Sequence, residues 1–190
     1  MTDEIWNMRG RQLIALNILN LVAITIFFLA FRLFNVTLPH FFLFIGIILF
    51  IQAICGFIKG DSTKSFLPIF EQVAKYEKEK MGREWMKQRK VGNVGQLLLS
   101  GLMFLQYYWN REMAESVIME LNFIFIATIF FLLFVLTNLM FVLHVRKVDR
   151  STFQQELKGY TWKSNLIGAG IGASFVLIIV MMTVFYIFLY

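Results

Sequence analysis

The sequence has few of the residues that build catalytic or metal centres. It contains one cysteine and two histidines among 190 residues. A single cysteine excludes an intrachain disulfide and any zinc or iron–sulfur site made of clustered cysteines. Cys55 lies inside an apolar run, where it is typical of a small packing residue. Zinc-protease, redox, nucleophile-elbow and phosphate-loop motifs are also missing. We therefore expect no enzyme, and neither a cofactor nor a metal.

Charged residues are also scarce, since only 16% of the chain is charged whereas 58% is hydrophobic. This balance excludes an ordinary soluble globular protein. A bilayer crossing needs about 20 apolar residues, and the chain has uncharged runs of that length at 12–31, 33–58, 91–110, 121–143 and 164–190. No cleavage site follows the first run, so we expect it to remain as a helix.

The predicted fold is an all-α integral membrane protein: a helical bundle with four long transmembrane helices and a fifth, weaker span at 91–110. The parts expected in chain order are an N-terminal helix with a transmembrane hairpin (1–58), a basic cytoplasmic helix (59–90), a second transmembrane hairpin (91–143), a short cytoplasmic helical loop (144–163) and a C-terminal transmembrane helix (164–190).

The positions of Lys and Arg predict the orientation, because cytoplasmic loops carry the basic excess. Five crossings with the N-terminus inside leave only Arg32 and Arg111 of the 18 basic residues outside. If 91–110 did not cross, the basic loop after 143 would lie outside, so charge favours a full crossing. The run 91–110 contains glutamines, asparagine and glycines, so a re-entrant or interfacial element remains the alternative. We expect a bacterial inner-membrane protein with a cytoplasmic N-terminus and an outside C-terminus.

The segment 66–90 has a helical apolar stripe, Pro68 in its first turn and a basic, aromatic end. It fits a solvated stalk, a helix on anionic lipid, or a docking helix for a soluble partner. The residues expected to contact partner or lipid are Lys75, Arg83, Trp85, Lys87, Arg89 and Lys90. Interleaved glutamates and the lack of a groove-reading motif argue against nucleic acid.

In the second cytoplasmic loop, 144–163, Ser151, Gln154 and Gly159 predict a helix of two turns packed on the first cytoplasmic segment or at the interface.

Amide side chains recur at one depth inside the predicted membrane. Asn17, Asn20, Gln52, Gln96 and Asn138 form this intramembrane polar layer. Interhelical hydrogen bonds are the favoured interpretation. A polar vestibule is the alternative, although no ionisable residue at mid-depth accompanies it.

Two further features concern packing near the ends of the helices. Arg32 and Glu120 lie at comparable heights and either reach the interface independently or form an ion pair. The last helix opens with small residues spaced four apart, which allow close helix contact within or between chains. This small-residue face consists of Gly168, Gly172, Ala169 and Ala173.

The sequence thus favours a homo-oligomeric membrane subunit that senses or recruits. Its basic cytoplasmic face would meet a soluble partner protein in a small signalling, stress-response or defence assembly, with membrane lipid around it. The alternative is an oligomeric ion channel or small-solute transporter lined by the amide layer.

Overall fold

The computed structural model describes residues 3–34, 37–112 and 123–189, and within these ranges the chain is helical with no strand. The elements are α1 (Asp3–Phe34), α2 (Leu38–Lys59), α3 (Pro68–Met81), α4 (Arg83–Asn110), α6 (Phe123–Arg150), the 3₁₀ turn η1 (Gln154–Leu157) and α7 (Tyr160–Leu189). This architecture confirms the predicted all-α fold.

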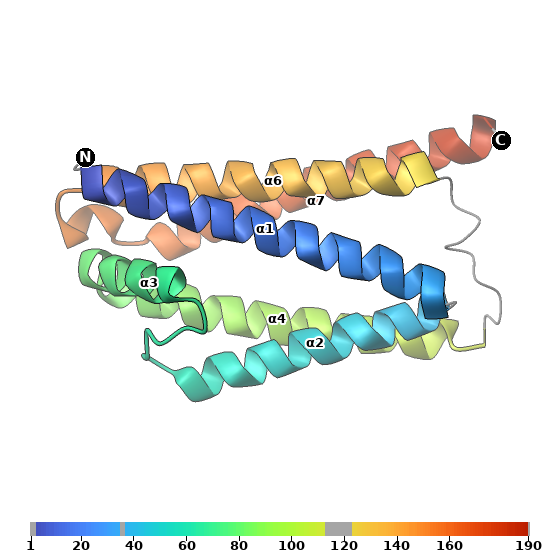
Figure 1. Cartoon of the computed structure of the whole chain (residues 1–190), viewed down its shortest axis with the longest axis horizontal. Coiled ribbons are helices and arrows are strands. Elements are labelled where there is room, and N and C mark those ends of the chain that lie inside the picture. Colours follow the sequence, from blue (N-terminus) through green and yellow to red (C-terminus); the bar gives the residue numbers. More distant parts are fainter. Residues whose placement is uncertain (1–2, 35–36, 113–122, 190) are drawn as a thin grey trace.

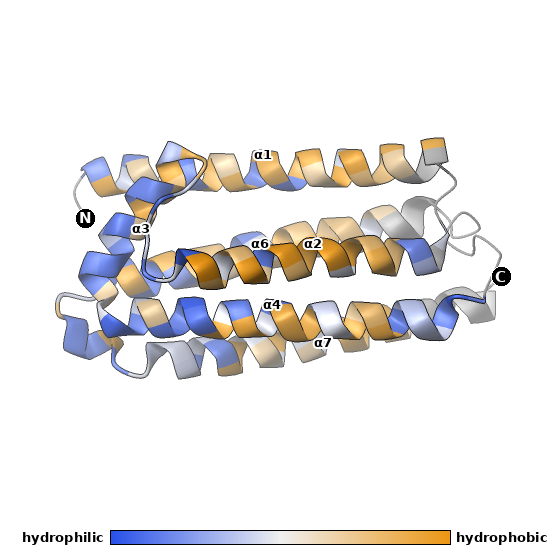
Figure 2. Cartoon of the chain, turned by 90° about the horizontal axis from the view of Figure 1, so that it is seen from below, coloured by the Kyte–Doolittle hydropathy of each residue, from blue (hydrophilic) through white to orange (hydrophobic). Residues whose placement is uncertain are grey.

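The long helices α1, α2, α4, α6 and α7 run side by side, and α3 lies across one end of them (Figure 1). Helices α1, α2, α6 and α7 contain stretches long and apolar enough to cross a membrane. The two termini lie at opposite ends of the bundle. Figure 2 shows that the end covered by α3 is hydrophilic while the lengths of α1 and α2 are mainly hydrophobic. We call the hydrophilic end, made of α3, η1 and the adjoining helix ends, the polar end.

Residues 91–110 belong to a single unbroken helix, because α4 continues without interruption from Arg83 to Asn110. A re-entrant hairpin would need the chain to reverse within this run, and it does not. Helix α4 lies antiparallel beside α2 along the bundle (Figure 1). The run with the weakest hydropathy is therefore paired with one of the most apolar helices.

Small residues of α2 allow α4 to approach closely. A methyl group built on Gly46 would lie 2.8 Å from the Phe104 ring, and the buried Ser100 hydroxyl donates to the Gly46 carbonyl at 2.9 Å. Further along, Ala53 is fully buried and Gly56 faces the Asn93 side chain. Close approach of this kind stabilises membrane helices through packing and polar contacts rather than through the hydrophobic effect.

The predicted helix over 66–90 is divided in two at Gly82. Gly82 has φ +56°, a left-handed conformation that glycine adopts without steric cost. The Gln154 side chain fits against it and donates Nε2 to the Glu79 carbonyl at 2.9 Å, near the end of α3. The break lets α3 cross the polar end while α4 turns into the bundle.

The second loop contains one 3₁₀ turn, η1, in place of the two-turn helix predicted there. Ser151 does not cap it, because its hydroxyl donates to the Val148 carbonyl at 2.7 Å. The turn instead buries Leu157 completely. The core that it joins consists of Met81, Trp85, Val148, Leu157 and Tyr160. The loop thus packs on α3 and the start of α4, which is one of the two positions expected for it.

Candidate functional site: a buried charge network at the polar end

The centre of the polar end is Arg9 of α1, whose side chain is only 3% exposed. Its Nε and Nη2 donate to the two carboxylate oxygens of Asp149 on α6, at 3.1 and 2.9 Å. Its Nη1 donates to Glu77 Oε1 on α3 at 2.8 Å and to Gln12 Oε1 at 2.8 Å. Two-point contact between guanidinium and carboxylate fixes both distance and orientation. One side chain therefore joins α1, α3 and α6.

Glu77 extends the network to α7. Its Oε1 lies 3.1 Å from His144 Nε2, and His144 Nδ1 lies 2.8 Å from the Tyr160 hydroxyl. Burial alone would raise the pKa of Glu77, but the hydrogen bond and charge of His144, together with Arg9, lower this pKa below its ordinary value. The carboxyl group therefore stays ionised, and the nitrogen facing it donates the hydrogen bond.

Glu84 is a second buried acid, placed in the first turn of α4. It accepts from Lys87 Nζ at 2.8 Å and, on α7, from the Thr161 hydroxyl at 2.8 Å and backbone N–H at 3.2 Å. The hydrogen bond from Lys87, assisted by those from Thr161, lowers the pKa of Glu84 to about 2. An N–H in the first turn of a helix has no partner within that helix, so Glu84 of α4 caps α7.

Three acids of this end, Glu77, Glu84 and Asp149, face inward. Glu79 of α3 and Glu156 of η1 are exposed, as are several of the bases. Arg83 and Lys90 are exposed, and the side chains of Lys75 and Lys87 are 58% and 64% exposed. Lys75 also pairs with Glu71 at 2.7 Å. Three of the six expected contact residues, Arg83, Lys87 and Lys90, therefore form an exposed basic group at the start of α4.

Two of the expected contact residues lie inward instead. Trp85 is buried in the core of the polar end. The half-buried Arg89 stacks over its ring, with 5.2 Å from Cζ to the ring centroid. Trp85 therefore packs the interior and is not available on the surface.

The amide layer does not assemble into one cluster in the described structure. Asn138 Nδ2 donates to the Phe134 carbonyl of its own helix at 2.8 Å. Gln52 is exposed and Gln96 half-buried. The buried atoms Asn17 Oδ1 and Asn20 Nδ2 have no hydrogen-bond partner in the described part of the chain. No two of these amides bond to each other within the described ranges.

Asn20 instead lines a cavity of about 380 Å³ between α1, α2 and α6. Most of its lining is apolar and includes Phe27, Phe41 and Phe130. The cavity therefore lacks the continuous polar surface that a water-filled path would present.

The remaining predicted residues divide between described and undescribed parts. Glu120 and the side chain of Arg32 lie outside the described residues. On α7, a methyl group on Gly168 would contact Met140 Cε at 3.7 Å, whereas Gly172 has open space around it. Ala169 and Ala173 are exposed. Most of this small-residue face is thus uncovered within one chain.

Sequence reasoning missed the charge network itself. Arg9 and Arg11 lie two residues apart before the same apolar run, and only the packing of α1 shows that Arg9 points inward. A usable signal was the position of His144 and Asp149 directly after an apolar run, since charges near buried surface need partners.

Comparison with known proteins yields no relative: no family model, no curated protein and no solved structure matches the chain.

Proposed function

We propose that this chain is a homo-oligomeric membrane subunit that recruits or senses, presenting its basic polar end to a soluble partner on the cytoplasmic side. The arrangement of charge is the observation that supports this. Glu77, Glu84 and Asp149 are held in internal contacts. The exposed charges at the start of α4 are basic, while the exposed acids Glu79 and Glu156 lie on α3 and η1. A negatively charged protein surface is the complement of such a face.

The connections within the polar end suit a subunit that transmits a signal. Arg9 links α1 to α3 and α6, and Glu84 links α4 to α7. A partner bound to this end would therefore contact a unit in which five helices are coupled. A change in helix packing inside the membrane would reach the same surface. We place the role in a small signalling, stress-response or defence assembly.

The amide layer provides little support for a channel or solute transporter. Its members are dispersed, and the cavity that includes Asn20 is apolar. We therefore favour recruitment over conduction.

Site-specific photo-crosslinking in cells tests the proposal. A photoreactive amino acid at Arg83, the exposed first residue of α4, should form adducts with a soluble protein. The matched control is Arg111, an exposed arginine just beyond the other end of α4. With the probe moved to Lys75, the Arg83→Glu/Lys90→Glu variant should lose most of the adduct. Absence of soluble-protein adducts at both polar-end positions would refute the proposal.

The orientation has its own test, in a Cys55→Ala background. A cysteine at the exposed Gln155 of η1 should resist an impermeant thiol reagent in intact cells and react after permeabilisation. A cysteine at Arg111 should react in intact cells. The reverse pattern would place the polar end outside.

A further inference from the structure

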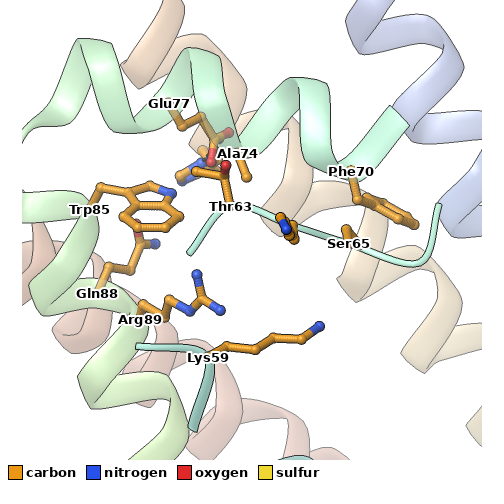
Figure 3. Close-up of a pocket in the computed structure, with 11 residues that line it drawn as sticks. Lys59, Thr63, Ser65, Phe70, Ala74, Glu77, Trp85, Gln88 and Arg89 are labelled. Carbon is orange, nitrogen blue, oxygen red and sulfur yellow. Dashed lines mark hydrogen bonds and ion pairs between the residues drawn. The ribbon is translucent and has the colours of Figure 1, made fainter. Parts of the chain in front are cut away.

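A cavity of about 360 Å³ opens at the polar end beside the charge network (Figure 3). Its walls come from the end of α2, the connection to α3, and parts of α3, α4 and α6. The polar residues in its lining that concern ligand binding are Lys59, Thr63, Lys64, Ser65, Gln88 and Arg89. Figure 3 shows Arg89 and Lys59 on the opposite side of the cavity from Glu77.

The cavity is positively charged because its only acid is already neutralised. Glu77 contacts Arg9 at 2.8 Å and His144 at 3.1 Å. The ammonium groups of Lys59 and Lys64 form neither an ion pair nor a hydrogen bond with the described residues. Arg89 is held by the Trp85 ring and by a hydrogen bond to the Ser62 carbonyl. Two ammonium groups without an ion pair and one fixed guanidinium thus line a space whose own lining holds no unpaired carboxylate. A further acid, outside the lining, is Glu71, whose pKa is lowered mainly by Lys75 and to a smaller extent by Lys64.

The cavity lies where apolar sequence gives way to polar sequence on three helices. Lys59 is the last residue of α2, Arg89 comes just before the run 91–110, and His144 comes just after the run 121–143. All three line this cavity. If the apolar runs span the hydrocarbon, this is the depth of the phosphate groups of a bilayer.

We propose that this cavity binds a phosphate-bearing anion, either the phosphate of an anionic lipid headgroup or a soluble phosphate. Lys59 and Lys64 supply charge, Arg89 supplies planar donors suited to phosphate oxygens, and Thr63 and Ser65 supply hydroxyl donors. The site is distinct from the exposed bases at the start of α4. Its test and the crosslinking test can therefore fail independently.

The test uses the full chain in nanodiscs of neutral phosphatidylcholine. One arm replaces part of the lipid with phosphatidic acid, and the other adds inorganic phosphate. Both follow tryptophan fluorescence, since Trp85 lines the cavity, together with the melting temperature. The variant is Lys59→Gln/Lys64→Gln, which spares Arg89 because Arg89 also holds the loop. The control, Lys158→Gln/Lys163→Gln, removes the same charge from exposed positions outside the cavity.

The cavity variant should bind the effective anion about 30-fold more weakly than the wild type, while the control changes less than threefold. An effect in the lipid arm identifies a headgroup site, and an effect in the phosphate arm identifies a soluble ligand. Equal losses in the two variants would reduce the effect to general surface charge and overturn the proposal. A wild-type chain that responds to neither anion would also overturn it. An unchanged melting temperature in neutral lipid confirms that the variants are folded.

Discussion

At the polar end, buried side chains with specific partners connect the helices, whereas along the apolar length close packing is concentrated between α2 and α4. Arg9 alone bonds to acids of two other helices. By contrast, the most apolar stretches of α1 and α7 contain no residue buried within the chain, among the residues described. Two regions of the same helices are therefore organised by different interactions.

The difference follows from the solvent around each region. In a bilayer, an apolar side chain gains little by exchanging lipid for another apolar side chain. Helix position then depends on small residues that permit close approach and on polar groups that need partners. The pair α2–α4 uses the first, and the polar end uses the second. Each mechanism can be removed separately.

Loss of the central arginine should have the largest effect. Arg9→Leu leaves Asp149 and Glu77 buried without their main cation. Breaking a buried ion pair on one side costs about 3–5 kcal/mol. We expect a strongly lowered melting temperature in mild detergent. Arg11→Leu is the control, because Arg11 is exposed on the same helix. Similar losses in both variants would mean that the network does not stabilise the polar end.

A methyl group at the α2–α4 contact should have the next largest effect. Gly46→Ala places a carbon 2.8 Å from the Phe104 ring, and overpacking of this kind costs about 1–3 kcal/mol. Gly101→Ala on α4 meets nothing within 4 Å and should leave stability unchanged or slightly raised, since alanine favours helix. Thermal unfolding of both variants in the same detergent provides the measurement. A stable Gly46→Ala protein would show that the contact tolerates separation.

Acid should weaken the connection between α4 and α7 in a defined pH range. The pKa of Glu84 is about 2 in the folded protein, below its ordinary value of 4.5. A carboxyl group whose pKa is lowered by folding contributes its full stabilisation at any pH above its ordinary pKa. This stabilisation is lost as the pH falls towards the pKa that the group has in the folded protein. The stability advantage of wild type over Glu84→Gln should therefore shrink between about pH 5 and pH 2. Melting temperatures at stepwise pH measure it, and a constant difference would exclude this role for the carboxylate.

The smallest effect on stability is expected at the small-residue face of α7. Gly172→Leu meets no atom of its own chain near the new Cβ, so the monomer should remain stable. If the face contacts a second subunit, the variant should insert normally but migrate as a smaller species. Gly170→Leu, also in open space, is the control because it points to another side of α7. A lowered melting temperature with unchanged assembly would instead indicate a contact within the chain.

The sequence predicts the helices well because length and hydropathy are local properties. The runs 12–31 and 91–110 lie within α1 and α4, and the described parts of 121–143 and 164–190 lie within α6 and α7. The run 33–58 begins at the end of α1 and continues as α2 from Leu38. The division at Gly82 was not foreseen, although a glycine after Lys78 and Lys80 is a local signal for the end of a helix. The Gln154 side chain that packs against it comes from a distant loop and could not be predicted. Likewise, a small-residue contact was assigned to α7, where spacing suggested it. The clearest close contact within the chain uses Gly46, Ala53 and Gly56 of α2. Their spacings of seven and three residues place them on one face of the helix, a signal that the sequence analysis did not use.

The charge network could not be predicted from the sequence, because it depends on contacts between distant segments of the chain. Its pairs are remote in sequence, and no periodic pattern marks which of two neighbouring arginines turns inward. Burial of Glu84 and Thr161 depends on where α4 meets α7, which is a tertiary property. Local patterns therefore predicted elements and a basic surface, and could not predict which charges are internal.

The separation of Arg9 and Asp149 also has a consequence in time. The two residues are 140 positions apart, and a ribosome adds roughly 5–20 residues each second. Arg9 therefore exists for on the order of ten seconds before its principal partner has been synthesised. During that interval its charge must remain in contact with water, which its place before the first apolar run permits. The N-terminal helix can enter the membrane early, but its polar end becomes fully paired only after α6 has been made.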